Sequence, residues 1–397
     1  MKRPKPKPLS KDDFAKLMMD CIRQTGEKGK IVYDAKEFSL RGEGKTYAAM
    51  FLTNAYTEYC AAPLADRSRV VRHYVRNWFG ASKEMPQDFE DVKPDLLPVV
   101  RSRAHFEINN LEVVGGTPLN WPYEILGEHF GVGVVYDLPE AMRSVSQNSL
   151  DPWGVTFYEA LEAAMENLLT LESKFIGPGD GEGVYLSATG DNYDASRLLI
   201  KDAIRRFRVK GDHIAMVPNR ENLIVVGSED VEGLAGMVKL AAKAMKEPRP
   251  ISGIALRLDG DEWTPWMPAE DHPSYAAFQE LRLQSFGQDY SQQKDMLDKL
   301  HAKNGEDVFV ANYSAIKRPD GKVFSYATWT ETTNSLLPKT DTLVLGRMGS
   351  EPQMVEWEEV VGIVGDLMEE VDIYPPRFRV REFPTEKQLA AMGNLLK

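Results

Sequence analysis

The sequence predicts an α+β protein, in which helices and antiparallel hairpins mix along the chain without a regular strand-helix-strand alternation. Amphipathic stretches predict the helices; Leu161, Met165 and Leu168, for example, recur at the spacing of one helical stripe. Short apolar runs around turn residues predict the hairpins. In "ALRLDGDEW" the dipeptide Asp259-Gly260 tolerates the positive φ angles of a tight turn.

Two proline clusters, at 84–98 and 246–250, divide the chain, because proline disfavours helix interiors and central strands. The sequence predicts a flexible basic arm at 1–11, an N-terminal α+β domain at 12–92, a core domain at 93–247, a C-terminal α+β domain at 248–375 and a tail with a short helix at 376–397.

Three stretches each offer a helix followed by two strands around a turn. The first has a helix at 11–24, strands at 30–40 and 45–52, and the turn at 41–44. The second has a helix at 156–171, strands at 174–176 and 184–189, and the turn at 177–183. The third has a helix at 290–303, strands at 307–316 and 322–329, and the turn at 317–321. The likeness is one of pattern and not of residues, so a true repeat and a coincidence both stay open.

Further elements follow from capping and alternation. Residues 213–227 predict two buried strands joined by Pro218-Asn219-Arg220-Glu221, and a helix follows with Ser228 as its N-cap. Apolar spacing predicts one helix face over 357–371, and the alternation in 377–381 favours a half-buried edge strand.

Composition excludes several classes of protein. The chain has 397 residues and a formal net charge of −12, which opposes non-specific attraction to nucleic acid. No apolar run approaches the roughly 20 residues that cross a membrane. Cys21 and Cys60 are too few for a disulfide framework, so a cytoplasmic setting is expected. The six histidines never form H-x-x-x-H, and no cofactor or metal is expected.

One fragment resembles a phosphate-binding loop. Gly44-Lys45-Thr46 are the last three letters of G-x-x-x-x-G-K-[ST], but Ser39 stands where the first glycine is required for the backbone to curl around phosphate. A turn between strands is the favoured interpretation. Nucleotide binding through Lys45 and Thr46 is the alternative.

Polar residues concentrate beside the predicted core at "GDNYDASRLL" and "PNREN". The candidate binding residues there are Asp191, Tyr193, Asp194, Asn219, Arg220 and Glu221. Arg220 is available to grip a carboxylate or a phosphate bidentately. The competing interpretation is structural: Asp194 or Ser196 caps the following helix, and Arg220 and Glu221 occupy a solvated turn.

Two tryptophans, Trp263 and Trp266, fall in a proline-containing segment that the sequence predicts to be a loop. Tryptophan is favoured at protein interfaces because it buries a large area with few rotatable bonds. The two rings either anchor a partner or fold back as a lid over their own domain.

Residues 94–246 resemble the YtpQ-like family of bacterial proteins, a domain-of-unknown-function family. The resemblance rests on Tyr136-Asp137, Ala164 with Glu166-Asn167-Leu168, Tyr193 with Ala195-Ser196, and Val217-Pro218-Asn219-Arg220. Glu221 stands where the family usually has Asp, and the region after about residue 250 is additional to the family's core. The resemblance implies a cytoplasmic bacterial protein and kinship of fold, and it implies no reaction.

These observations favour a non-catalytic binding or adaptor protein whose partner is another protein. The alternative is an enzyme of unrecognised type, either nucleotide-dependent through Lys45 and Thr46 or hydrolytic through Asp191, Asp194 and Glu221.

Overall fold

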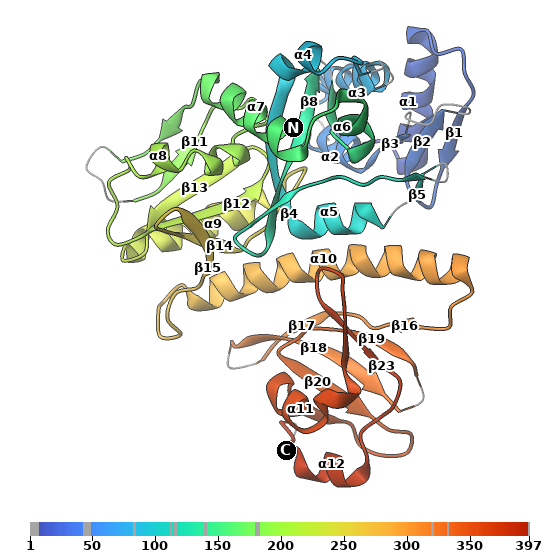
Figure 1. Ribbon diagram of the computed structural model, residues 1–397, viewed down its shortest axis with the longest axis vertical. Helices are drawn as coiled ribbons and strands as arrows, with labels where there is room; N and C mark the ends of the chain where they lie inside the picture. The colour runs from blue at the N-terminus through green and yellow to red at the C-terminus, as the bar shows by residue number, and fades with distance from the viewer. Residues whose placement is uncertain are drawn as a thin grey trace, which may run out of the picture.

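The computed structural model describes residues 8–42, 49–81, 85–111, 113–114, 117–138, 141–178, 183–318, 321–331 and 333–395. Helices and mostly antiparallel sheets mix along the chain, which confirms the predicted α+β class. The long helix α10 (Tyr275–Asn304) crosses the molecule, with the C-terminal sheets on one side of it and the rest of the chain on the other (Figure 1).

The N-terminal part packs three helices on a small sheet. It contains α1 (Lys11–Thr25), α2 (Thr53–Ala61), α3 (Arg67–Ala81) and the antiparallel strands β1 (Ile31–Asp34), β2 (Ser39–Gly42) and β3 (Ala49–Phe51). Ser10 caps α1 by accepting a hydrogen bond from the backbone N–H of Asp13 at 3.2 Å. Phe14, Met18 and Trp78 are buried between the helices and the sheet.

The prediction of one strand over residues 30–40 is wrong. A hairpin turn lies inside that range, because the chain reverses between β1 and β2 and Phe38 takes a φ of 47°. Part of the predicted turn at 41–44 belongs to β2, and the rest lies outside the described residues, as do Lys45 and Thr46. The strand β3, and not a helix, is the next described element, and it pairs antiparallel with β2.

The core part begins with a sheet of order β4-β8-β7, on which β9 pairs with β8. Its elements are α4 (Phe89–Val92), η1 (Lys93–Asp95), β4 (Leu96–Ser102), α5 (Arg103–Asn110), β5 (Val113–Val114), β6 (Thr117–Pro118), β7 (Glu124–Leu126), β8 (Phe130–Leu138), β9 (Ala141–Ser144), α6 (Gln147–Trp153) and α7 (Phe157–Thr170). A capping box of Thr156 and Glu159 starts α7. Asn167 fixes α7 to the sheet by donating to the carbonyls of Lys93 (2.7 Å) and Leu96 (2.9 Å).

A six-stranded antiparallel sheet follows, in the order β10-β11-β13-β12-β14-β15. The strands are β10 (Phe175–Ile176), β11 (Tyr185–Ser187), β12 (His213–Asn219), β13 (Asn222–Gly227), β14 (Ala255–Asp259) and β15 (Glu262–Trp266), and the helices η2 (Ala195–Leu199), α8 (Lys201–Ile204) and α9 (Val231–Ala244) lie between them in sequence. The predicted hairpins β12–β13 and β14–β15 are both confirmed, and Gly260 has the positive φ (55°) expected at the corner. The sheet crosses the boundary predicted at residue 247, because β14 pairs with β12.

Three local predictions in this region are corrected. Asp230, and not Ser228, caps α9 by accepting from the N–H of Gly233 at 2.8 Å. The predicted helix after Asp194 is a 3-10 turn followed by the short α8, and neither Asp194 nor Ser196 caps it through its side chain. Trp263 and Trp266 belong to strand β15 and not to a loop.

The C-terminal part has two four-stranded sheets, of order β16-β19-β23-β22 and β17-β18-β20-β21. Its strands are β16 (Phe309–Val310), β17 (Ser314–Lys317), β18 (Val323–Thr330), β19 (Ser335–Pro338), β20 (Thr342–Gly346), β21 (Gln353–Glu356), β22 (Glu369–Val371) and β23 (Arg377–Val380), and its helices are α11 (Trp357–Val364), η3 (Gly365–Leu367) and α12 (Glu386–Ala391). Trp329, Trp357 and Val360 are buried in its core.

The sequence misjudges this part at two points. The helix predicted over 357–371 ends at Val364. The rest of the predicted range forms η3 and β22 instead. The strand at 377–380 is interior and not an edge, because β23 lies between β19 and β22. The predicted tail at 376–397 therefore supplies an internal strand, although it does contain the expected short helix, α12.

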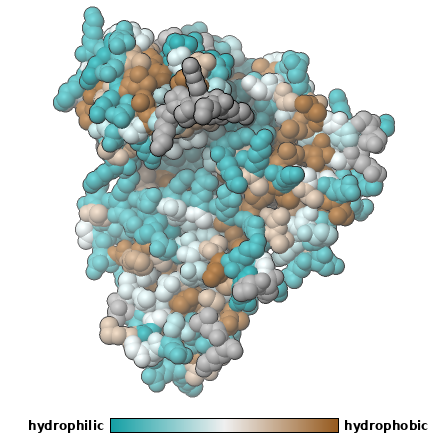
Figure 2. Space-filling view, turned by 180° about the vertical axis from the view of Figure 1, so that it is seen from behind, coloured by the Kyte–Doolittle hydropathy of each residue, from teal (hydrophilic) through white to brown (hydrophobic). Residues whose placement is uncertain are grey.

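The three predicted helix-hairpin stretches lie in different surroundings. An antiparallel hairpin follows α1, α7 and α10, but these hairpins belong to sheets of three, six and four strands. No helix in the described ranges combines the length and the apolar character needed to cross a bilayer, and this includes the 30-residue α10. On the face shown in Figure 2, apolar residues lie in separate patches among hydrophilic ones.

Candidate functional site

A cavity of about 910 Å³ lies along α10, between the core part and the C-terminal sheets; we call it the cleft. Its wall is assembled from segments distant in sequence. They are the start of α5, the β7–β8 turn, β15, α10, Tyr313, Ser325, residues 339–341 and the segment from Glu370 to Pro376. The volume is in the range of sites that hold a drug-sized molecule or a short peptide.

One face of α10 lines the cleft. Arg282, Phe286 and Tyr290 are spaced four residues apart, which places them on the same side of a helix. The Arg282 guanidinium lies 5.5 Å from the centroid of the Phe286 ring. Tyr290 stacks on Tyr313, with ring centroids 4.9 Å apart and an interplanar angle of 15°. The helix thus presents a cation and two aromatic rings to one cavity.

His129 and Tyr374 connect the two sides of the cleft. His129 Nδ1 lies 2.7 Å from the Tyr374 hydroxyl oxygen, and the His129 ring meets Phe286 edge-on at 5.1 Å. The Arg103 guanidinium covers the Tyr374 ring at 4.4 Å. Burial lowers the pKa of His129 to about 4, so its imidazole is neutral at neutral pH.

Charges of both signs line the cleft. The cations are Arg103, Arg282 and Lys339, and the acids are Glu128, Asp341, Glu370 and Asp372. Arg103 has a carboxylate partner in Glu107 at 3.4 Å. Arg282 forms no ion pair with any residue that the structure describes, and its charge is available to a ligand.

Among the described residues that line the cleft, no hydroxyl group of serine or threonine is hydrogen-bonded to a histidine. Ser325 donates its hydroxyl to Asp341 at 2.8 Å and not to a histidine. His129 Nδ1 is hydrogen-bonded to the Tyr374 hydroxyl. No group of three or more His, Cys, Asp or Glu within the described ranges lies close enough to hold a metal ion.

Asp289 is half-buried on α10. Its carboxylate accepts a hydrogen bond from the Ser102 hydroxyl at 3.3 Å, where α5 begins. Burial raises the pKa of Asp289 to about 7, against a smaller lowering effect of Ser102. This carboxyl group therefore changes charge near neutral pH at the contact between α10 and the core part.

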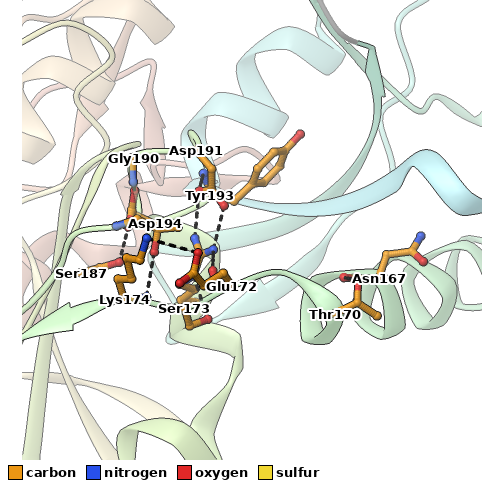
Figure 3. A network of polar contacts seen from close by, with 12 residues as sticks. Asn167, Thr170, Glu172, Ser173, Lys174, Ser187, Gly190, Asp191, Tyr193 and Asp194 are labelled. Carbon is orange, nitrogen blue, oxygen red and sulfur yellow. Dashed lines mark hydrogen bonds and ion pairs between the residues drawn. The ribbon is translucent and has the colours of Figure 1, made fainter.

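The predicted site residue Asp191 has a structural partner. Its two carboxylate oxygens accept from Arg197 at 2.9 and 2.7 Å, and one also accepts from the N–H of Tyr193 at 2.9 Å. Burial on its own would raise the pKa of Asp191, but the hydrogen bonds from Arg197 and Tyr193 outweigh it and lower the pKa. Figure 3 shows this carboxylate among its polar neighbours.

The Asp194 carboxylate also has hydrogen-bond partners within the protein. It is fully buried and accepts from the N–H groups of Thr189 (3.0 Å) and Gly190 (2.8 Å) and from the Ser187 hydroxyl (Figure 3). Tyr193 is buried nearby, and burial, followed by the Asp137 carboxylate, raises its pKa. These residues shape the loop before η2.

The β12–β13 turn adjoins the loop of Asp191 and Asp194, because the N–H of Ala195 donates to the Arg220 carbonyl at 3.1 Å. Among the described residues, no side-chain hydrogen bond links Asn219, Arg220 or Glu221 to Asp191 or Asp194. Asn219 is buried; it donates to the Ala244 carbonyl at 3.0 Å and accepts from the N–H of Glu221 at 3.0 Å. The Glu221 side chain is 57% exposed. Arg220 lines a different cavity, of about 160 Å³, which we call the small cavity. Neither cavity is lined by Asp191, Asp194 or Glu221.

The two tryptophans differ in position. Trp263 is buried in the core, and its indole N–H donates to the Leu198 carbonyl at 3.1 Å. The ring is part of the core and is therefore not a lid over its own domain. Trp266 is half-buried, meets Phe278 edge-on at 5.5 Å and lines the cleft. Of the predicted binding residues, Trp266 alone lines this cavity.

Sequence reasoning missed Arg282, Phe286 and Tyr290, although their four-residue spacing is a usable signal. It also missed His129 and Tyr374, for which no local motif exists. These two residues meet because of the tertiary fold.

Comparison with known proteins finds relatives that carry the name UPF0354 protein. One from Listeria monocytogenes serovar 1/2a is 34% identical over 167 residues, which are 41% of this chain and 59% of the relative. One from Bacillus cytotoxicus is 26% identical over 183 residues, 44% of this chain and 64% of the relative. One from Listeria innocua serovar 6a is 33% identical over 101 residues, 25% of this chain and 38% of the relative.

The chain thus spans less than two thirds of the length of each of these relatives. No family model matches the chain, and no solved structure matches it. The relatives are bacterial proteins of an uncharacterised family, and their shared name states no activity. The narrower YtpQ-like assignment stays a prediction.

Proposed function

We propose that this chain is a cytoplasmic binding or adaptor protein whose cleft holds a short extended segment of another protein. The observation that carries the proposal is the pair of edge strands at the cleft. Pro265 and Trp266 of β15 line it, as do Glu370 and Val371 of β22. Each of these strands pairs with a neighbour on one side only among the described strands.

Edge strands favour a peptide over a metabolite as the occupant. Such a strand presents backbone C=O groups and, except at Pro265, N–H groups that an extended segment can pair with. Side-chain pockets next to the strand supply selectivity. The mixed charges of the cleft suit the same occupant, because a peptide carries donors, acceptors and side chains of either charge. The two free thiols, Cys21 and Cys60, suit a reducing compartment.

The side chains of the cleft indicate which peptide would bind. Arg282 lies on the face of Phe286 and has no carboxylate partner within the described ranges, so an acidic residue of the ligand is its natural counterion. Tyr313, which stacks on the buried Tyr290, and Trp266 offer apolar surface close by. We therefore expect an acidic residue next to an aromatic or aliphatic one in the bound segment.

The test is to pan a displayed library of short random peptides against the full chain, with counter-selection on the variant Arg282→Gln. Enriched peptides should share the acidic-apolar pair and bind Arg282→Gln at least tenfold more weakly, which is about 1.4 kcal/mol. The matched control is Arg318→Gln, because Arg318 lies 4.5 Å over Phe324 outside the cleft. Equal binding to both variants, or no enrichment, would contradict the proposal.

The enzymatic alternatives gain no support from the described contacts. Asp191 and Asp194 hold Arg197 and the loop before η2, whereas the Glu221 side chain is 57% exposed and forms no hydrogen bond with either aspartate in the described structure. The nucleotide alternative rests on Lys45 and Thr46, outside the described residues.

A further inference from the structure

The small cavity is distinct from the cleft and is rich in arginine. It lies against β4, β8 and β9, and α5 and the β12–β13 turn complete its wall. Arg101, His105, Trp121, Met142 and Arg220 line it. None of these residues lines the cleft, so a ligand of the small cavity is independent of the peptide proposed for the cleft.

Two fully buried arginines, Arg197 and Arg377, show how this fold provides hydrogen-bond acceptors for a guanidinium, whereas Arg101 and Arg220 are half-buried. Arg377 donates to Gln293 Oε1 (2.6 Å) and to the carbonyls of Ala311 (2.9 Å), Leu336 (3.0 Å) and Tyr290 (3.3 Å). Arg197 likewise forms four hydrogen bonds, two of them to one carboxylate. A buried guanidinium has five donors, and in both cases most of them are used.

Arg101 and Arg220 lack such partners. Arg101 donates to the carbonyl of its own neighbour Val100 at 2.7 Å. Arg220 Nη1 reaches only the weak acceptor Met142 Sδ at 3.6 Å, and its buried Nε has no partner. Neither residue forms an ion pair with any part of the chain that the structure describes. Most of their donors are therefore free to bind a ligand.

Glu221 is the carboxylate that acts on Arg220, but its side chain is 57% exposed and forms no ion pair with Arg220 in the described structure. Arg249, the next cation, is paired with Glu58 at 3.0 Å and lies 4.0 Å from Glu221. Burial, followed by repulsion from Arg249, lowers the pKa of Arg220 to about 10. Burial, followed by Arg220, lowers the pKa of Arg101 well below its usual value. Protein surrounds the Arg101 side chain, and the small cavity still leaves it partly accessible.

We infer that the small cavity binds an oxyanion, a carboxylate or phosphate group of a small molecule, between Arg101 and Arg220. An unpaired buried cation is unfavourable, and a bound anion with planar or tetrahedral oxygens would use the free guanidinium donors. The volume of about 160 Å³ limits the ligand to a small acid or inorganic phosphate and is too small for a nucleotide.

Neighbouring residues hold the pocket in shape. Asn110 binds the backbone of Trp121 twice, donating to its carbonyl at 3.0 Å and accepting from its N–H at 2.7 Å. The His105 ring lies beside the Trp121 ring, with centroids 5.7 Å apart. Burial and the two arginines lower the pKa of His105 to about 3, so its neutral imidazole adds a hydrogen-bonding group without further charge.

The test measures the thermal midpoint of the full chain in phosphate, sulfate or malonate against chloride at equal ionic strength. At a hundred times its dissociation constant, the bound anion should raise the midpoint by about 3 °C. A response to phosphate and sulfate identifies a tetrahedral group, and a response to malonate a carboxylate. Arg101→Met and Arg220→Met should each abolish the rise. The matched control Arg257→Met, which changes an exposed arginine of β14, should keep it.

The thermal midpoints of Arg101→Met and Arg220→Met without an anion give a second test. Without an anion, each Met variant should melt no lower than the wild type, because it removes a half-buried charge that has no ion-pair partner among the described residues. A purely structural arginine would instead lower the midpoint when it is replaced. In the wild type, the Nε–Hε NMR resonance of Arg220 should also shift saturably with the active anion, and this readout needs no variant. The inference fails if no anion exceeds chloride, or if the rise persists in both variants.

Discussion

His129 Nδ1 and the Tyr374 hydroxyl oxygen lie 2.7 Å apart although 245 positions separate the two residues in sequence. The hydrogen bond joins the β7–β8 turn of the core part to the segment between β22 and β23 of the C-terminal part. It therefore closes one wall of the cleft, and the shape of the cleft depends on the docking of the C-terminal sheets.

We predict that Tyr374→Phe destabilises the protein by about 1 kcal/mol, because one partly buried hydrogen bond is lost and the ring packing stays. Chemical denaturation monitored by fluorescence measures the loss. The control is Tyr158→Phe, at a side chain that is 67% exposed. Equal stability of the two variants would show that the bond does not hold the cleft wall.

Asp289 should make stability depend on pH. Its pKa is about 7 in the folded protein and about 3.9 in the unfolded chain. Between these values the folded state binds one proton more than the unfolded state, so the contribution of Asp289 falls as pH rises from about 4 to about 7. At about 1.4 kcal/mol per pKa unit, the full effect is roughly 4 kcal/mol.

The variant Asp289→Asn isolates this effect, because other groups titrate in the same window. The stability of Asp289→Asn relative to the wild type should increase between pH 4 and pH 7 and level off above that. Urea denaturation at a series of pH values measures the difference. A difference that does not change with pH would rule out titration of Asp289 in this range.

Asp191→Ala should destabilise the protein strongly, by roughly 3–5 kcal/mol, because it leaves Arg197 buried without its carboxylate. Arg197 is 1% exposed in this ion pair. Glu221→Ala, at an exposed carboxylate, should change stability by less than about 0.5 kcal/mol. A stable Asp191→Ala variant that has lost a hydrolytic activity would instead favour the enzymatic alternative.

Local chemistry explains where the sequence predicts the fold well. Asp259-Gly260 and the apolar runs beside Arg220 and Glu221 encode two hairpins through their own turn residues, and both hairpins are present. Caps are harder to predict, because Ser228 and Asp230 both precede an apolar periodic stretch and only the hydrogen bond from Gly233 decides between them. Asp194 has the chemistry of a helix cap, whereas its three hydrogen bonds come from the preceding loop and Ser187.

The residues that form the cleft could not be predicted from local sequence patterns. Arg103, His129, Tyr313 and Tyr374 sit on segments with no shared motif, and packing of the C-terminal sheets against α10 brings them together. At Trp263, in contrast, the local sequence pattern gives a wrong prediction. A tryptophan near prolines suggests an exposed anchor, but its register on β15 points the ring into the core.

The two tryptophans should therefore respond differently to truncation. Trp263→Ala removes a buried ring and should cost about 3–5 kcal/mol. Trp266→Ala should cost less, because its ring is half-buried, but it should weaken the binding of peptides selected for the cleft. Denaturation and peptide titration on the two variants measure both effects. Comparable losses of stability would contradict the assignment of Trp266 to the cleft wall.

The most direct test of the central claim, that the cleft holds a segment of a partner protein, is site-directed photo-crosslinking in bacterial cells. A photoreactive phenylalanine analogue replaces Phe286 in the cleft or, as a control, Tyr158 on the exposed side of α7. The account predicts a discrete protein adduct from position 286 that Arg282→Gln diminishes and that position 158 does not form. No adduct from position 286, or the same adducts from both positions, would contradict it.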